Sequence, residues 1–141
     1  MRQNSLVPEI SVTDFERSLR FYTEILGFKV EYKREEEGFA FLSLGSSQIM
    51  IDRIGVGRTW ETGKFEYPLG RGINFQIEVE SIDGILENLK KNAIKLFLEV
   101  EEKWYRKGDV EAGNKQFLVQ DPDGYLLRFA EDLGEREIGD F

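Results

Sequence analysis

Apolar and polar residues alternate along the chain in an order of elements that occurs twice. In each half, a strand with period 2 precedes an apolar stripe at helical spacing, and three further strand-like stretches follow. The two apolar stripes consist of Phe15, Leu19, Tyr22 and Leu26, and of Ile82, Ile85, Leu86 and Leu89. The pattern therefore predicts two β-α-β-β-β modules in tandem.

The predicted strands and the breaks between them set the limits of the modules. Strands are expected at residues 6–12, 28–33, 39–44 and 48–54, and then at 73–80, 94–100 and both arms of a closing hairpin. Residues 55–71 are rich in glycine and are predicted to form a linker. We expect a single domain over residues 1–141, built from modules at about 6–54 and 72–131, with a tail at 132–141.

Local signals mark where these elements begin and turn. Thr13 and Glu16 have the spacing of a capping box, with Thr13 as the N-cap of the first helix, and Gly27 ends that helix. Residues 121–124, Asp-Pro-Asp-Gly, predict a type I turn that closes the final hairpin. On its two arms, one face carries Phe117, Val119, Leu127 and Phe129, and the other carries Gln116, Leu118, Gln120 and Arg128.

An α+β fold follows, in which each sheet has a helix on one face and leaves its other face open. With the helices outside, we expect the two open sheet faces to form a cleft. The polar and aromatic side chains predicted on these faces are Glu9, Ser11, Phe39, Phe41, Asn74, Gln76, Glu78, Gln116 and Arg128. Apolar walls with a few polar groups are typical of a small-molecule pocket. For Phe39 and Phe41, packing in a core or a dimer seam is an equally open alternative.

Large aromatic residues also occur where the chain is predicted to be irregular. Trp60 lies in the linker, and Trp104 and Tyr105 lie in a charged loop expected at residues 101–113. Exposed rings of this size usually contact something. Flat rings beside acidic residues suit a planar, cationic ligand through stacking and cation–π attraction, and plugs on the seam between modules are the alternative.

Charge and composition exclude several classes of function. The net charge of −8 disfavours a nucleic-acid partner. It favours a cationic ligand through long-range attraction, and solubility alone is an equally good explanation of the charge. The chain has no cysteine and no histidine, so it lacks thiol chemistry and the commonest ligand of zinc and iron. No apolar run has membrane-spanning length and the start lacks a signal-peptide core, which predicts a cytoplasmic protein without a membrane partner.

Four short motifs together resemble the vicinal-oxygen-chelate superfamily, which includes glyoxalase I, extradiol dioxygenases, fosfomycin-resistance enzymes and bleomycin-resistance proteins. They are Ser-Val-Thr-Asp at 11–14, Ser-Leu-Arg-Phe-Tyr at 18–22, Leu-Gly-Phe at 26–28 and the Asp-Pro-Asp-Gly turn. The resemblance covers roughly residues 6–131. It implies the paired-module fold and an open sheet face that holds the site.

Catalytic members of that superfamily hold a divalent metal with His and Glu side chains on this face. Carried over to this chain, the ligand positions fall on Val7, near Ile51, on Asn74 and on Arg128, and Asp52 is assigned to the wrong face. This set offers few donors for a metal. We therefore expect no cofactor, no metal and no catalytic residue.

Within the superfamily, the chain is most similar to the bleomycin-resistance branch, whose members are small, acidic homodimers that sequester the drug. The resemblance implies a homodimer that binds a bleomycin-type, cationic and aromatic antibiotic without chemistry. The expected ligand-binding residues are Glu9, Phe39, Phe41, Trp60, Asn74, Gln76, Glu78, Trp104, Tyr105, Gln116 and Arg128. The alternative is a lyase, isomerase or dioxygenase with an unconventional site. Whether the modules pair within one chain or across two chains stays open.

Overall fold

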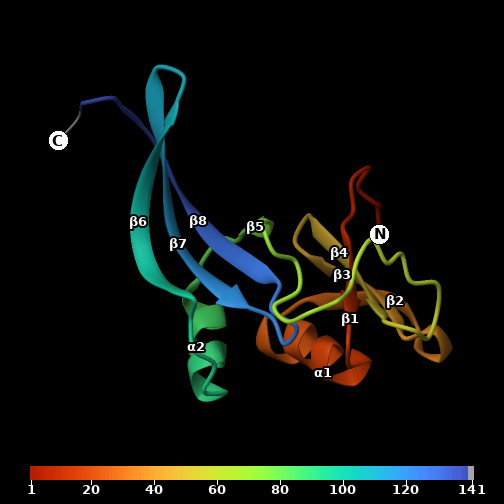
Figure 1. The fold of residues 1–141 in the computed structure, drawn as a ribbon. Helices are drawn as coiled ribbons and strands as arrows, with labels where there is room; N and C mark the ends of the chain where they lie inside the picture. Colours follow the sequence, from red (N-terminus) through yellow and green to blue (C-terminus); the bar gives the residue numbers. More distant parts are fainter. Residues whose placement is uncertain (140–141) are drawn as a thin grey trace. The chain divides into compact units, whose positions relative to one another are not determined.

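A computed structural model describes residues 1–139 of the chain. The chain divides into two compact units, and each unit contains one four-stranded mixed sheet (Figure 1). The first unit comprises Met1–Arg71 together with Asp121–Tyr125, and the second comprises Gly72–Gln120 and the chain from Leu126 onward. The α+β class and the two β-α-β-β-β modules predicted from the sequence are confirmed.

The first unit follows the predicted order of elements. Its elements are β1 (Glu9–Val12), α1 (Phe15–Arg20), a π-helical continuation η1 (Phe21–Ile25), β2 (Lys29–Arg34), a 3-10 turn η2 (Glu35–Glu37), β3 (Phe39–Leu44) and β4 (Ser47–Arg53). The strands lie in the order β1-β4-β3-β2, with β1 parallel to β4 and the other pairs antiparallel. This order places the first strand of the module at one edge of the sheet.

The second unit repeats this arrangement with longer strands. Its elements are β5 (Asn74–Glu78), α2 (Asp83–Lys91), β6 (Leu98–Lys107), β7 (Val110–Gln120) and β8 (Leu126–Glu137). The strands lie in the order β5-β8-β7-β6, again with the first strand of the module at an edge and parallel to the last. The two sheets therefore have the same topology.

The predicted irregular loop at residues 101–113 is wrong. This segment continues β6 and β7 as a long hairpin that turns at Gly108, and β8 extends through most of the predicted tail. Opposite charges face each other along the hairpin, with Glu102 paired to Lys115 and Arg106 paired to Glu111. Such cross-strand pairs favour a ladder that a charge-rich sequence does not reveal by itself. The remainder of the predicted tail includes residues 140–141, which lie outside the described residues.

Strand register in the first unit confirms the predicted separation of the two faces of β3. Phe41 pairs with Met50, whereas Ala40 pairs with Ile51, which in turn pairs with Ile10 of β1. Paired residues share a face of the sheet. Ala40, Ile51 and Ile10 therefore lie on one face of the sheet, and Phe41 lies on the other, which we call the open face because it also carries the exposed Glu9. Phe41 itself is buried on that face.

The Asp121–Tyr125 turn packs into the first unit through a buried hydrogen-bond network. The hydroxyl of Tyr22 donates to Asp121 Oδ2 at 2.8 Å, and the backbone N–H of Leu69 donates to the carbonyl of Asp123, also at 2.8 Å. Thr13 donates to Asp123 from both its backbone N–H and its hydroxyl. The predicted N-cap role of Thr13 is therefore wrong: Asp14 caps α1, because Thr13 is engaged by a turn about 110 residues away.

Candidate functional site

The open face of the first sheet carries a stack of aromatic side chains. The rings of Tyr32 and Phe41 lie 5.4 Å apart at an angle of 17°, and the Arg34 guanidinium lies 4.0 Å from the centre of the Phe39 ring. Phe41 is completely buried and Phe39 nearly so, whereas Tyr32 is 42% exposed. Tyr32 is thus the ring of this stack that a ligand can reach.

Tyr32 was not among the residues predicted from the sequence. A β-bulge between Val30 and Tyr32 shifts the register of β2, so that Tyr32 pairs with Phe41 and Arg34 pairs with Phe39. A bulge inserts one extra residue and changes which side chains share a face. Simple alternation therefore does not find Tyr32, and the only sequence signal for it is an aromatic residue next to charged ones.

Two carboxylates lie on the same open face as the aromatic stack. Ser11 and Phe39 both pair with Asp52, and Glu9 pairs with Met50, so Glu9 and Asp52 share this face. Burial raises the pKa of Glu9, Asp52 raises it further, and Arg34 lowers it. Burial also raises the pKa of Asp52, against a hydrogen bond with Ser11 that lowers it.

Asp52 corrects the residue assigned from the family pattern on the fourth strand. That assignment fell on Ile51 and put Asp52 on the wrong face, but Ile51 is completely buried beside Ile10, and Asp52 faces the open side. The sequence does contain a signal for this placement: Ile49 and Ile51 form the apolar face of β4, so Asp52 belongs to the opposite face. Asp52 Oδ1 is buried and has no hydrogen-bond partner within the described part of the chain.

The open face of the second sheet carries five of the predicted polar residues. Gln76 pairs with Arg128, while Glu78 and Gln116 both pair with Ala130, and Asn74 continues the same face of β5. The Arg128 guanidinium donates to Gln76 Oε1 at 2.6 Å. The structure therefore brings Asn74, Gln76, Glu78, Gln116 and Arg128 together on one face, as predicted.

Gln116 is the central residue of that face. Its amide nitrogen donates to the Tyr105 hydroxyl at 2.6 Å and to Glu101 Oε1 at 3.1 Å, which adds Tyr105 to the group. Gln116 Oε1 and Arg128 Nε are buried and lack partners among residues 1–139. One acceptor and one donor are therefore left without a hydrogen bond on this face.

An arginine guanidinium lies over the ring of each tryptophan. Trp60 is 64% exposed, and the Arg58 guanidinium lies 4.0 Å from its ring centre. Trp104 pairs with Gly113 and has Arg136 at 4.1 Å over its ring, so it lies on the opposite face of β6 from Tyr105. A Cβ on Gly113 would come within 2.6 Å of the Trp104 ring. The structure thus does not bring Trp104 together with Tyr105 and Gln116.

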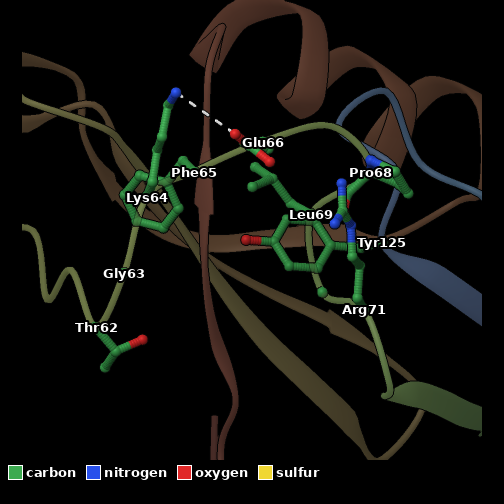
Figure 2. Close-up of a pocket in the computed structure, with 10 residues that line it drawn as sticks. Thr62, Gly63, Lys64, Phe65, Glu66, Pro68, Leu69, Arg71 and Tyr125 are labelled. Carbon is green, nitrogen blue, oxygen red and sulfur yellow. Dashed lines mark hydrogen bonds and ion pairs between the residues drawn. The ribbon is translucent and has the colours of Figure 1, made fainter.

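A cavity of about 350 Å³ lies in the first unit, apart from the open sheet face (Figure 2). Its walls are formed by residues 62–66 and 68–71, in the second half of the linker, and by Tyr125. Nothing in the sequence pattern predicted this cavity, because Tyr125 is 54 residues beyond the end of the linker. Gly70 lies directly against the Tyr125 ring, since a Cβ there would be 2.4 Å from it.

The described residues contain neither a cluster of metal-ligating side chains nor a membrane-spanning helix. No group of three or more His, Cys, Asp or Glu side chains in that range converges as a metal site would require. No helix within residues 1–139 combines the length and hydropathy needed to cross a bilayer. Glu9 and Asp52 are the pair of carboxylates on the first open face, and a pair alone is fewer donors than a transition-metal site uses.

Similarity to known proteins extends over most of the chain. The chain is 31% identical over 126 residues to a lactoylglutathione lyase of Arabidopsis thaliana, covering 85% of this chain and 41% of that protein. This chain therefore spans about two fifths of the length of that relative. A bleomycin resistance protein of Geobacillus stearothermophilus is 26% identical over 136 residues, covering 90% of this chain and 96% of the relative.

A family model shows which superfamily the chain belongs to, and a solved structure shows the same fold. The crystal structure of TioX from Micromonospora sp. ML1 matches with a TM-score of 0.71 at 20% identity, covering 93% of this chain and all of that one, which shows the shared fold. The model of the Glyoxalase/Bleomycin resistance protein/Dioxygenase superfamily matches residues 3–129. This chain belongs to the Glyoxalase/Bleomycin resistance protein/Dioxygenase superfamily.

Proposed function

We propose that this protein binds a small cationic aromatic compound, with a bleomycin-type antibiotic as the specific ligand, and holds it without changing it chemically. The observation that carries the proposal is the pair of carboxylates, Glu9 and Asp52, on the same sheet face as the exposed ring of Tyr32. Carboxylates attract a cation, and a flat ring stacks on a planar ligand and attracts its charge. The net charge of −8 would add long-range attraction.

Two polar groups on the second sheet lack hydrogen-bond partners among the described residues, which supports a ligand with polar groups of its own. Gln116 Oε1 and Arg128 Nε offer an acceptor and a donor that no described residue uses. A buried polar group without a hydrogen-bond partner costs free energy, so a ligand that supplies the missing partners forms a more stable complex. Among the matched relatives, the bleomycin resistance proteins agree with this chain over almost their whole length, which supports the choice of drug.

We expect calorimetric titration with bleomycin, both metal-free and copper-loaded, to show binding, and mass analysis to recover the drug unmodified. Replacing Glu9 with Gln or Asp52 with Asn should weaken binding by about tenfold each, because each change removes one attractive charge. Glu16→Gln is the matched control, since Glu16 is exposed on α1, away from the open face. Absence of heat at high micromolar drug would remove the bleomycin assignment.

The same titrations should depend on pH in a defined direction. Because the pKa values of Glu9 and Asp52 are both raised, these groups take up protons at a higher pH than ordinary carboxyls do. A protonated carboxyl no longer attracts a cation. Affinity should therefore decrease as the pH is lowered, beginning above the range in which exposed carboxylates titrate.

A second candidate function is a lyase or isomerase with an unconventional site. It is favoured by the same two carboxylates, since a carboxyl with a raised pKa is suited to accept and return a proton. Similar proteins named lactoylglutathione lyase agree with this possibility. A chemically altered product in the mass analysis, lost in Asp52→Asn, would support this function and overturn sequestration.

We also propose that the protein is a homodimer. The support is the exposure of apolar side chains in the linker, where Trp60 and Tyr67 are each about two-thirds accessible. Sedimentation at micromolar concentration should give the mass of two chains. A single-chain mass under those conditions would refute the dimer.

A further inference from the structure

The cavity in the linker has the size of a binding site and is built on a fixed frame. Its volume of about 350 Å³ is within the range of small-molecule pockets, roughly 300–1,000 Å³. It lies within the first unit, and none of its lining residues belongs to the open sheet face with Glu9 and Asp52. A ligand held here would therefore be distinct from the one proposed above.

The walls of this cavity are anchored to the rest of the unit. The backbone N–H of Leu69 donates to the carbonyl of Asp123, and the Tyr125 hydroxyl donates to the carbonyl of Ser11, both at 2.8 Å. Gly70 packs its backbone against the Tyr125 ring, and Gly124 approaches Pro68 in the same way. The linker is thus held against the turn, which gives the pocket a defined aromatic wall.

Arg71 supplies a positive charge at a fixed position in the pocket. Its Nε donates to the carbonyl of Pro68 at 3.2 Å and its guanidinium NH2 group donates to the carbonyl of Tyr67 at 3.0 Å. These two bonds orient the guanidinium but do not neutralise it, and within residues 1–139 it forms no ion pair with a carboxylate. In a chain with a net charge of −8, an arginine held in this way is available to an anion.

The other lining residues define the rest of the ligand. Lys64 also lines the pocket and lies 3.5 Å from Glu66, so the pocket contains two cations and one carboxylate. Figure 2 shows Leu69 and Arg71 next to the Tyr125 ring, with Lys64 further along the linker. Phe65 and Leu69 add apolar surface to the aromatic wall.

We propose that the linker pocket binds a small aromatic carboxylate. The carboxylate group would pair with Arg71, and with Lys64 in support, while its ring packs against Tyr125 and Phe65. Guanidinium groups bind carboxylates through paired, charge-assisted hydrogen bonds, and rings stack on rings at little entropic cost. This ligand has the opposite charge from the cationic compound of the sheet face, so the two proposals stand or fall separately.

Benzoate is the probe that tests this site. In a ¹⁵N–¹H NMR titration of the full chain, we expect benzoate to shift the amide signals of residues 62–67 and 69–71 and of Tyr125. Acetate, which lacks the ring, and benzylamine, which carries the opposite charge, should shift these signals at least about tenfold less at equal concentration. Benzoate shifts should also diminish as salt is added, because the attraction is between exposed charges.

Variants identify the residues responsible. Arg71→Met should weaken benzoate binding by about tenfold or more, and Lys64→Met by a smaller factor. Arg58→Met is the matched control, because Arg58 belongs to the same linker but lies over Trp60 and does not line the pocket. Lys64→Met leaves the two Arg71 bonds intact, so it stays informative if Arg71→Met disturbs the linker.

Three results would overturn the proposal. They are equal shifts from benzoate and benzylamine, unchanged benzoate binding in both Arg71→Met and Lys64→Met, and benzoate shifts that map to the sheets and not to the linker. Loss of benzoate binding with intact binding of the cationic drug in Arg71→Met would separate this site from the sheet-face site. The reverse result in Asp52→Asn would separate them equally.

Discussion

Replacing Phe41 with alanine is expected to lower the free energy of unfolding by about 3–5 kcal/mol. Phe41 is completely buried, pairs with Met50 across the sheet and stacks on Tyr32, so its removal leaves a cavity in a packed layer. A loss of this size is a large part of the roughly 5–15 kcal/mol that stabilises a typical domain. Urea unfolding followed by circular dichroism measures it directly.

The experiment distinguishes the two roles that the sequence left open for Phe41. Tyr32→Leu is the matched variant, because Tyr32 belongs to the same stack but is 42% exposed. It should change stability far less than Phe41→Ala and weaken binding of the cationic ligand by about tenfold. If instead Phe41→Ala keeps its stability and loses only ligand binding, Phe41 is a pocket wall and not part of the core.

The contribution of Asp121 to the stability of the protein is expected to decrease as the pH rises from about 4 to 7, and Asp121→Asn should remove this contribution. Burial raises the pKa of Asp121 from 3.8 to about 6. Between these values the folded chain holds a proton on Asp121 that the unfolded chain releases. The stability contributed by that proton is complete below pH about 4 and is lost as the pH rises through about 6.

The expected amplitude follows from the size of the shift. A difference of this size in the pKa of one carboxyl corresponds to about 3 kcal/mol between the two ends of the range. Urea unfolding of both proteins at several pH values gives the difference between their pH profiles, in which contributions from the other carboxyls cancel. Parallel profiles for the two proteins would contradict the assignment.

Tyr22 provides a second test of the same buried network. The Tyr22 hydroxyl donates to Asp121 and thereby lowers the pKa that burial raises. Tyr22→Phe should therefore move the loss of stability to a higher pH than in the unmodified protein, and cost about 1–3 kcal/mol through the lost hydrogen bond. The carboxyl signal of Asp121 in ¹³C NMR reports the same shift independently.

The order of elements and the faces of most strands were determined by the sequence alone. Period-2 alternation and helical stripes are local properties, and they correctly placed Phe39 and Phe41 opposite Ala40 and grouped Gln76 with Arg128. Buried faces require apolar side chains at regular spacing, so the spacing reveals the face without knowledge of the partner strands.

Tertiary structure decided the features that depend on distant or irregular pairing. The bulge that brings Tyr32 onto the open face, the continuation of β6 through a charged segment and the anchoring of Thr13 by Asp123 each require a partner strand or turn. The linker pocket likewise has Tyr125 as one wall, where its ring packs against Gly70. The Thr13–Asp123 and Gly70–Tyr125 contacts join residues far apart in the chain, whereas the bulge and the charged hairpin depend on how neighbouring strands pair. None of these features leaves a periodic signal in the sequence, because their energy arises only when the units have folded.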